Sequence, residues 1–452
     1  PGSRSRRQLG SALGPESPPP KPGLRLRTYR GLSRALEPVV PLWLRMRQRQ
    51  GKEDGRRRSE RYGIASAARP EGPLVWMHAA SVGETNVTLP LMRALSEARP
   101  DLNFLLTTGT TTSADLAERR LGAKSIHQFV PLDSPRFALR FLEHWKPDLA
   151  VFTESEIWPN LILETASARI PIAVVNARIS HRSFSRWRRN GGVARPLFGR
   201  LNLVLAQNER FARWFSLLGA RDVRNAGNIK IDSPPPPVDP LELQRLATAV
   251  AGRRVLLAAS THPGEDEIVT AAHKLLAARF PDLLTIIVPR HPERGGAIAD
   301  MLARAGLRAS RRAAGAQPDA ATDVYVADTI GELGTFYKLA PVAFIGGSLV
   351  PHGGQNPIEA VRHGAAVVTG PHTHNFADAI AALSRQRGLV VVETAEALAD
   401  AVAQLLADPA ALAASTRGAE TALAALSGAL DRSTAALLPM LPPEPSELRR
   451  AS

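Results

Sequence analysis

The chain contains no cysteine, and it lacks the motifs that mark several common enzyme classes. Without cysteine there are no structural disulfides and no thiolate metal sites, which suits a reducing compartment. There is no GxxxxGK[ST] phosphate loop, no GxGxxG after the first predicted strand and no GxSxG elbow. The neighbouring histidines lack a ligand arrangement with carboxylates, so we predict no metal and no cofactor; they are His352, His363, His372 and His374.

Positive charge is concentrated at the amino-terminal end. Residues 1–70 hold seventeen Lys and Arg against five Asp and Glu, a net charge of +12 out of the chain's +15. The remaining residues therefore carry only +3. An enzyme of nucleic acids more often carries its positive charge on the folded body, along a groove, so we predict no nucleic-acid partner.

The amino-terminal segment favours association with an anionic membrane surface. Around Trp43 aliphatic side chains alternate with arginines, a composition that suits a membrane interface. The apolar stretch is far shorter than the ~20 residues that span a bilayer, two prolines disfavour one long helix, and no signal peptide is expected. We predict a disordered basic tail over 1–24 and a membrane-associating segment over 25–70. The alternative is a helix packed on the body.

From residue 73 the chain alternates between strand and helix patterns. Apolar runs such as "PLVWMHAA" and "DLAVFTES" are each followed by helical sequence, which is typical of a parallel sheet covered by helices. Four prolines in "KIDSPPPPVDP" interrupt the pattern, which restarts at "RRVLLAAS". We predict an α/β fold of two Rossmann-like domains over 71–232 and 241–440, with a proline hinge at 233–240 and a tail at 441–452. Because ligands of such sheets bind outside the carboxyl ends of the strands, we expect a cleft between the domains to hold the site.

In the first domain, ionisable side chains follow the predicted strands. Glu84 follows "VWMHAASVG", whose small residues permit close approach of a substrate, but an acid in the first turn of a helix is also explained by capping. Glu154 and Glu156 end the strand in "FTESEIWPN", and Lys230 stands just before the proline hinge. From the residues alone, capping or a solvated surface stays open for each of them.

In the second domain, four motifs at successive strand ends predict a phosphate and nucleotide site: "AASTHPGEDE", "IIVPRHPER", "DTIGELGTFY" and "GGQNPIEA". Arg290 suits a phosphate because its planar head donates several hydrogen bonds. Asn356 and Pro357 open a helix whose first turn could carry a phosphate, while Glu359 could accept ribose hydroxyls. Any single motif could be an ordinary glycine-rich turn.

Eight motifs occur in order between about residues 25 and 435: "HAASVGE", "TESEIWPN", "NARIS", "AQNE", "GNIKID", "STHPGEDE", "PRHPER" and "GGQNPIEA". Together they resemble the 3-deoxy-D-manno-octulosonate (Kdo) transferases of lipopolysaccharide assembly. The resemblance implies a GT-B glycosyltransferase fold, no need for a metal, CMP-Kdo as the donor and a lipid A precursor of the lipid IVA type as the acceptor. It also implies a place at the cell inner membrane, peripheral or anchored by the amino-terminal segment, with the catalytic domains on the cytoplasmic side.

The same resemblance assigns roles to single residues. It makes Glu84 the general base of an inverting transfer, and it gives Glu154 and Lys230 a part in stabilising the transition state. The segments that would contact CMP comprise Pro289, Arg290, Ile330, Gly331, Glu332, Asn356, Pro357, Ile358 and Glu359. The enzyme alternatives are another GT-B transferase or a UDP-sugar epimerase. The alternative of a different class is a non-catalytic basic protein that binds a membrane or RNA.

Overall fold

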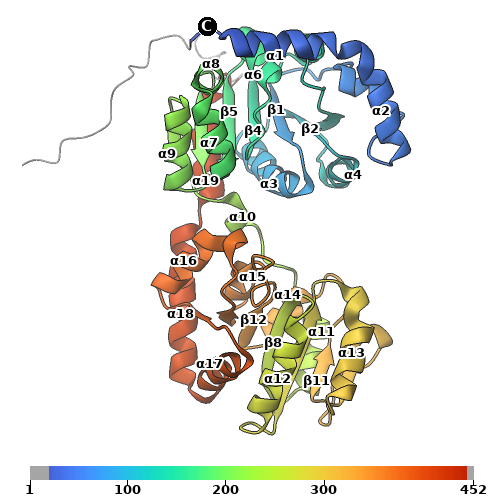
Figure 1. The fold of residues 1–452 in the computed structure, drawn as a ribbon, viewed down its shortest axis with the longest axis vertical. Helices are drawn as coiled ribbons and strands as arrows, with labels where there is room; N and C mark the ends of the chain where they lie inside the picture. Colours follow the sequence, from blue (N-terminus) through green and yellow to red (C-terminus); the bar gives the residue numbers. More distant parts are fainter. Residues whose placement is uncertain (1–19, 445–452) are drawn as a thin grey trace, which may run out of the picture. The chain divides into compact units, whose positions relative to one another are not determined.

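The structure is a computed structural model that describes residues 20–444. The described chain forms two compact units, one of residues 20–233 with 428–444 and one of residues 234–427 (Figure 1). Of the tails predicted over 1–24 and 441–452, residues 1–19 and 445–452 lie outside the described residues. Each unit holds one parallel sheet, as the alternation of strands and helices predicted.

The first unit is built on a seven-stranded parallel sheet in the order β3-β2-β1-β4-β5-β6-β7. Chain order reverses between β1 and β4, and ligands of open α/β sheets bind at such a switch point. The strands are β1 (Leu74–Ala79), β2 (Asn103–Thr108), β3 (Ser125–Phe129), β4 (Leu149–Thr153), β5 (Ile172–Ala177), β6 (Leu203–Ala206) and β7 (Val223–Asn225).

Helices cover both faces of this sheet because its strands are apolar on both sides. Successive side chains of a strand point to opposite faces, so Trp76 enters one core cluster while Val75 and Met77 enter the other. The register places Trp76 beside Leu105 and Ala150, which share its cluster. The helices are α3 (Val82–Ala98), α4 (Thr111–Arg120), α5 (Pro135–Trp145), α6 (Pro159–Ser167), α7 (His181–Arg189), α8 (Gly191–Phe198), α9 (Glu209–Leu218) and α10 (Ile229–Asp232).

The end of the chain returns to the first unit. We predicted that the second domain runs to residue 440, but helix α19 (Ala429–Leu437) packs against α3 and buries Leu437 in the core of the first unit. The carboxylate of Asp232 accepts the N–H groups of Gly428 (2.8 Å) and Leu430 (2.7 Å), which fixes the start of this helix. An amphipathic pattern shows that a helix has a buried face, but it does not show which sheet that face covers.

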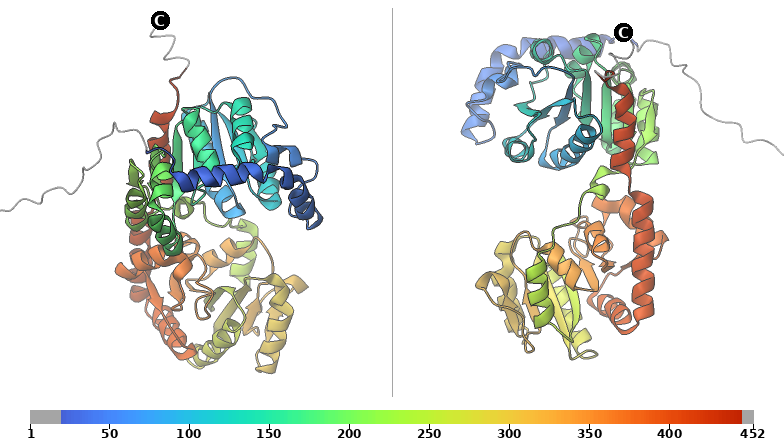
Figure 2. Two further views of the ribbon diagram at one scale, coloured as in Figure 1. Left: turned by 45° about the horizontal axis from the view of Figure 1, so that its top comes forward. Right: turned by 180° about the vertical axis from the view of Figure 1, so that it is seen from behind.

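The amino-terminal segment forms two helices, α1 (Leu24–Ala35) and α2 (Val40–Arg49), separated by a 3-10 turn at Glu37–Val39. The break confirms that these residues do not form one long helix. One side of α1 is packed on α5 and α8 and is tied down by Tyr29, whose hydroxyl donates to Asp133 at 2.8 Å (Figure 2). The other side of the two helices leaves large apolar side chains exposed: Leu32, Leu36, Val39, Leu42, Trp43 and Met46.

No single helix among residues 20–444 is long and apolar enough to cross a membrane. One pair, Ala395–Ala407 with Pro409–Met440, meets the criteria of length and composition only when its two members are combined, and it is bent by 104°.

The second unit has a seven-stranded parallel sheet in the order β10-β11-β9-β8-β12-β13-β14, with its switch point between β8 and β12. The strands are β8 (Arg254–Thr261), β9 (Leu283–Pro289), β10 (Ala309–Arg311), β11 (Val324–Val326), β12 (Val342–Ile345), β13 (Ala366–Thr369) and β14 (Leu389–Val391). The helices are α11 (Pro240–Ala249), α12 (Glu265–Ala277), α13 (Gly295–Arg304), α14 (Leu333–Leu339), α15 (Pro357–Arg362), α16 (Ala377–Arg385), α17 (Ala395–Ala407) and α18 (Pro409–Leu426).

The proline run between the two sheets is neither helix nor strand, as predicted. It lies against the second unit, where the carbonyl of Pro236 contacts His363 Nε2 at 3.0 Å. A Cβ on Gly334 would meet the same carbonyl oxygen at 2.3 Å, so only glycine permits this approach. The segment therefore has contacts that hold it to α14 and α15.

Candidate functional site at the carboxyl ends of the strands

Glu84 lies in the first turn of α3, directly after β1 and next to the switch point. Its backbone N–H donates to Ser81 Oγ at 3.4 Å, and its own Oε2 accepts the N–H of Ala80 at 2.6 Å. This is the reciprocal arrangement of a capping box, shifted by one residue. The capping interpretation of Glu84 is thus realised in the structure. The same contacts hold a carboxylate that is only 9% exposed in one position at the strand end.

The surroundings of Glu84 disfavour the charged form of its carboxylate. Burial raises the pKa of Glu84, and the negative charges of Glu156 and Glu154 raise it further. The N–H of Ala80 and the neighbouring His78 oppose that rise in pKa. A carboxylate whose pKa is moved toward neutrality is a more effective general base than an ordinary glutamate.

Glu156 is the second acid of this group, and its pKa moves in the opposite direction. Burial raises the pKa of Glu156, but hydrogen bonding and the charge of neighbouring groups outweigh burial and lower it. Trp158 Nε1 donates to Glu156 Oε2 at 2.7 Å. His78 Nε2, which is buried, lies 3.7 Å from Glu156 Oε2, a distance too long for a hydrogen bond. Two carboxylates with pKa values pushed apart are typical of acid–base sites.

Glu154, two residues before Glu156, is the centre of an ion-pair cluster. It follows β4 with a left-handed backbone, φ 60°, and its side chain is 3% exposed. Lys230 Nζ lies 2.7 Å from Glu154 Oε1, and Arg178 Nε lies 2.6 Å from Oε2. The structure therefore brings together Glu154 and Lys230, which the sequence analysis selected separately. It adds Arg178, which stands in "NARIS" and was not selected, although it ends the strand next to β4.

Arg290 follows β9 in the second unit, and its side chain is exposed. Its backbone N–H donates to the carbonyl of Thr261 at 3.0 Å, but its guanidinium makes no ion pair with any residue in the range 20–444. Burial raises the pKa of Glu359, while Asn356 and the charge of Arg290 lower it. Asn356 Nδ2 donates to Glu359 Oε1 at 3.1 Å. Arg290 is therefore near enough to Glu359 for its charge to act on that carboxylate, and whether these residues hold a nucleotide stays a prediction.

The helix that Asn356 opens is short. Asn356 Oδ1 accepts the N–H of Ile358 at 3.1 Å, and Pro357 occupies the first helical position, as predicted. Because α15 has only six residues, its end supplies little of the charge of a long helix. Phosphate binding at this helix start stays a prediction. Pro289, the last residue of β9, is buried directly before Arg290.

The motif after β11 contains one exposed apolar side chain, Ile330, and one acid that is already paired, Glu332. Ile330 is 86% exposed, beside Gly331 with φ 91°. Glu332 is paired with Arg312 through both of its oxygens, and hydrogen bonding with Arg312 lowers its pKa. Ile330 thus presents an exposed apolar side chain in this motif, whereas the carboxylate of Glu332 is already paired. Whether Gly331 and Glu332 contact CMP stays a prediction.

A buried acid that the sequence analysis passed over shapes the turn after β12. Glu265 is fully buried, and its carboxylate accepts the N–H groups of Gly347 (2.6 Å), Ser348 (2.9 Å) and Leu349 (2.9 Å). A carboxylate that accepts several backbone N–H groups fixes a turn in one shape. Its position in "GEDE" resembles an ordinary helix start, so sequence alone gave no signal for this role.

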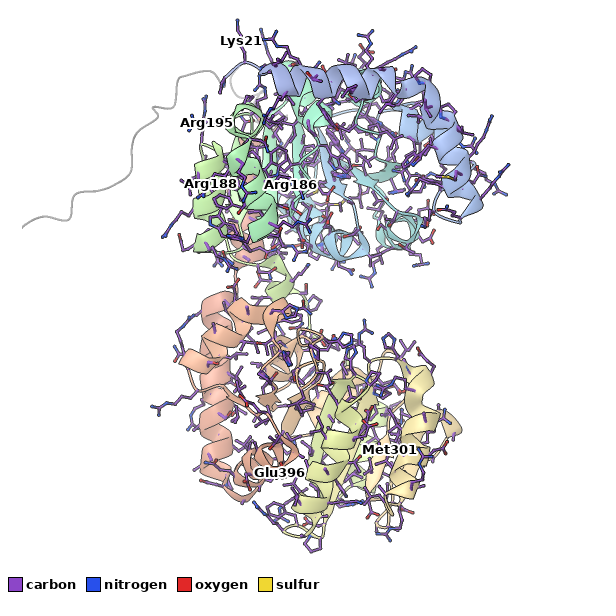
Figure 3. All side chains as sticks on the ribbon, in the orientation of Figure 1. Lys21, Arg186, Arg188, Arg195, Met301 and Glu396 are labelled. Carbon is purple, nitrogen blue, oxygen red and sulfur yellow. The ribbon has the colours of Figure 1, made fainter. Side chains whose placement is uncertain are left out.

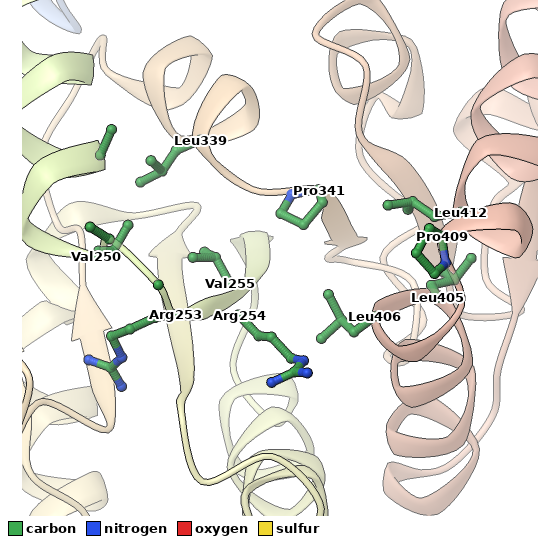
Figure 4. Close-up of a pocket in the computed structure, with 13 residues that line it drawn as sticks. Val250, Arg253, Arg254, Val255, Leu339, Pro341, Leu405, Leu406, Pro409 and Leu412 are labelled. Carbon is green, nitrogen blue, oxygen red and sulfur yellow. The ribbon is translucent and has the colours of Figure 1, made fainter.

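A cavity of about 430 Å³ lies elsewhere in the second unit, at the amino ends of β8 and β12 (Figure 4). Its two arginines are occupied: Arg253 donates to four backbone carbonyls, and Arg254 is paired with Asp282. This cavity is therefore at the wrong end of the sheet for the predicted site, and we assign no ligand to it. Within residues 20–444 no three His, Asp or Glu side chains are grouped to hold a metal ion.

Comparison with known proteins gives the relatives of this chain. The family model described as "3-Deoxy-D-manno-octulosonic-acid transferase (kdotransferase)" matches residues 56–233. A probable mitochondrial 3-deoxy-D-manno-octulosonic acid transferase of Arabidopsis thaliana is 35% identical over 89% of this chain and 93% of its own length. The 3-deoxy-D-manno-octulosonic acid transferase of Haemophilus influenzae is 35% identical over 84% of this chain and 90% of its own.

The fold has a solved counterpart. The crystal structure of a glycosyltransferase from Rickettsia africae superposes on this chain with a TM-score of 0.54 at 13% sequence identity. The match covers 82% of this chain and 98% of the other chain. With its two parallel sheets, the chain thus has the GT-B fold that was predicted. Because the chain is 35% identical to these two relatives over most of its length, it belongs to the family of 3-deoxy-D-manno-octulosonic acid transferases.

Proposed function

We propose that this chain transfers Kdo from CMP-Kdo to a lipid A precursor of the lipid IVA type, in lipopolysaccharide biosynthesis. The observation that carries the proposal is the placement of the family's motif residues. In a chain 35% identical to a Kdo transferase over most of its length, these residues stand at the carboxyl ends of both sheets. There they include the buried acids Glu84 and Glu154 in the first unit and the exposed Arg290 in the second.

In the proposed reaction, Glu84 is the general base. Its carboxylate takes the proton of an acceptor hydroxyl while the hydroxyl oxygen forms a bond to the anomeric carbon of Kdo. The bond from that carbon to the phosphate oxygen of CMP breaks, and CMP leaves with the electron pair. Attack from the side opposite CMP inverts the anomeric centre. Proton transfer of this kind typically contributes about 10²–10⁴-fold to the rate.

The remaining selected residues would hold the donor. The unpaired guanidinium of Arg290 supplies positive charge for the phosphate of CMP, and Glu359 offers an acceptor for ribose hydroxyls. Lys230, anchored on Glu154, would balance the carboxylate of Kdo or the negative charge that develops in the transition state. Because these cations can carry the charge of the leaving group, we propose that the transfer needs no metal.

Membrane association is proposed for the outer side of α1 and α2. Since Leu26 and Leu44 of these helices are buried, deletion of the segment would also expose part of the core. Substitution of Leu32, Leu36 and Leu42 by serine is a cleaner change, because all three are more than half exposed. We expect weaker binding to anionic vesicles and unchanged thermal stability. From these exposed apolar side chains and the lipid nature of the proposed acceptor, we propose a place at the cytoplasmic face of the inner membrane.

The decisive experiment is mass spectrometry of the products formed from CMP-Kdo and a lipid A precursor, with and without EDTA. A mass increase of one or more Kdo units in both reactions supports the proposal, and the count of units gives the number transferred. Thermal stabilisation by UDP but not by CMP would favour a UDP-sugar enzyme. Salt-sensitive RNA binding without any transfer would favour the non-catalytic alternative.

A further inference from the structure

Helices α7, α8 and α9 carry many positive charges, although the net charge of residues 71–452 is only +3. Residues 181–219 contain eight arginines and one carboxylate, Glu209. The exposed arginines form no ion pair with any of the described residues; they are Arg182, Arg186, Arg188, Arg189, Arg195, Arg210 and Arg213. An uncompensated group of this size attracts an anionic partner. We call the surface of these helices the arginine face.

Aromatic packing fixes the arginine face on the first unit. Phe184 of α7 is buried and stacks on Trp214 of α9, with ring centroids 4.6 Å apart and an angle of 8°. Trp187 packs edge-on against Phe198 of α8 at 5.5 Å. Since these rings occupy the inner side of α7, its arginines are directed to the outside. The positive charge is therefore presented by rigid helices and not by loops.

The arginine face surrounds an apolar hollow. A cavity of about 540 Å³ lies between residues 20–23 and the three helices, and its lining combines Lys21, Arg188 and Arg195 with apolar side chains. Among these, Leu217 is 58% exposed. Figure 3 shows Lys21, Arg195, Arg188 and Arg186 along one side of the unit.

This combination identifies the chemistry of the partner. We propose that the arginine face docks on the phosphate headgroups of an anionic lipid bilayer. A lipid surface presents phosphates directly above apolar chains, which matches cations set around an apolar hollow. Single-stranded nucleic acid would need a basic groove with open aromatic rings, but here Trp187 and Trp214 are partly buried against phenylalanines.

The arginine face would act together with the amino-terminal helices. Helix α1 packs on α8, and Leu24 at its start is 79% exposed. The amino-terminal end of α1 thus adjoins the arginine face, while α2 lies at the other end of α1 (Figure 1). The inference deepens the proposed function, on which it rests for the lipid nature of the acceptor, by assigning a second membrane contact. It predicts that removal of either contact leaves part of the membrane binding intact.

The test is sedimentation of the full chain with vesicles of phosphatidylglycerol and phosphatidylcholine. In the test variant Arg186, Arg188 and Arg195 are replaced by Gln. Each arginine near an anionic surface favours binding by about fivefold, so the partition should fall by about a hundredfold. The control replaces three exposed arginines of the second unit by Gln, Arg304, Arg385 and Arg417, which removes the same charge. It should bind vesicles as the unaltered chain does.

Two further measurements separate this inference from the proposed function. Transfer to an acceptor dispersed in detergent should be the same in the unaltered chain, in the arginine-to-glutamine test variant and in the control. Absence of transfer by the unaltered chain would count against the proposed function alone, whatever the vesicle binding. Leu217→Asp, at an exposed position, should also weaken vesicle binding without a change in thermal stability. Equal vesicle binding by variant and control overturns the inference. Loss of RNA binding without loss of vesicle binding would do so too.

Discussion

The carboxyl ends of the two sheets have opposite electrostatic character. In the first unit they hold three acids, Glu84, Glu154 and Glu156, and the pair Arg178 and Lys230 is committed to Glu154. In the second unit Glu265 and Glu332 are occupied by structural bonds, whereas Arg290 and Ile330 are left open. One unit therefore holds a carboxylate in a fixed position, as the proposed general base requires, and the other leaves one cation and one apolar side chain open for the proposed donor.

This difference matches a division of labour between chemistry and donor binding. A general base must be held in place before the substrate arrives, and Glu84 is held by its bond to Ala80. A cation attracts a phosphate most strongly when no carboxylate of the protein forms an ion pair with it. Arg290 forms no such ion pair with any of the described residues. Substitutions in the first unit should therefore change the rate, and substitutions in the second should change the affinity for the nucleotide.

The largest effect is expected for Glu84→Gln. The amide oxygen of the new side chain can still accept the N–H of Ala80, so the fold should persist, but the side chain can no longer take a proton. We expect kcat to fall by about 10²–10⁴-fold with CMP affinity unchanged. Glu97→Gln, at an exposed position of the same helix, is the matched control. A Glu84→Gln variant that turns over like this control would show that Glu84 only caps the helix.

Arg290→Ala should shift the dissociation constant of CMP instead of kcat. A hydrogen bond to a charged group contributes about 1.5–3 kcal/mol, which corresponds to a loss of affinity of about 10–100-fold. Isothermal titration of CMP, with Arg304→Ala as an exposed control from the same unit, measures the difference. Unchanged CMP affinity together with a lower kcat would contradict the division between the two units.

The pH dependence of the reaction should reveal the coupling between Glu156 and Glu84. The base works only when it is deprotonated, so activity is lost as the pH falls through the pKa of Glu84. The negative charge of Glu156 raises the pKa of Glu84, and Glu156→Gln should therefore move the acidic limb of the kcat profile to lower pH. Glu143→Gln, on the exposed side of α5, should leave the limb in place. A limb that moves to higher pH, or not at all, would refute the coupling.

Much of the site followed from the sequence because of one geometric rule. Parallel strands bring their carboxyl ends to the same edge, so Glu154 and Lys230, which were selected separately and stand far apart in the chain, can lie in contact, as they do. Apolar runs predicted the central strands, because strands of a parallel sheet that helices cover are buried on both faces. The predicted cleft between the domains stays a prediction.

Other features depend on contacts that no local pattern encodes. Helix α19 could have covered either sheet, and only its packing on α3 decides. Glu265 stands in a run of acids where any member could begin the helix, and the turn that it binds lies 82 residues further along the chain. The net charge of residues 71–452 did not indicate the arginine face, because acids elsewhere in the chain cancel its charge in the sum without forming ion pairs with it.

The smallest effect, and the most specific, is expected for Ile330→Ser. An isoleucine that is 86% exposed contributes little to folding, so the free energy of unfolding should change by no more than about 0.5 kcal/mol. If the side chain packs against the bound nucleotide, its partial burial should account for a severalfold loss of CMP affinity, and about tenfold at most. Leu241→Ser, on α11 of the same unit and 69% exposed, removes similar apolar surface away from the strand ends. Equal CMP affinities of the two variants would place Ile330 outside the donor site and leave donor binding at that edge to the charge of Arg290.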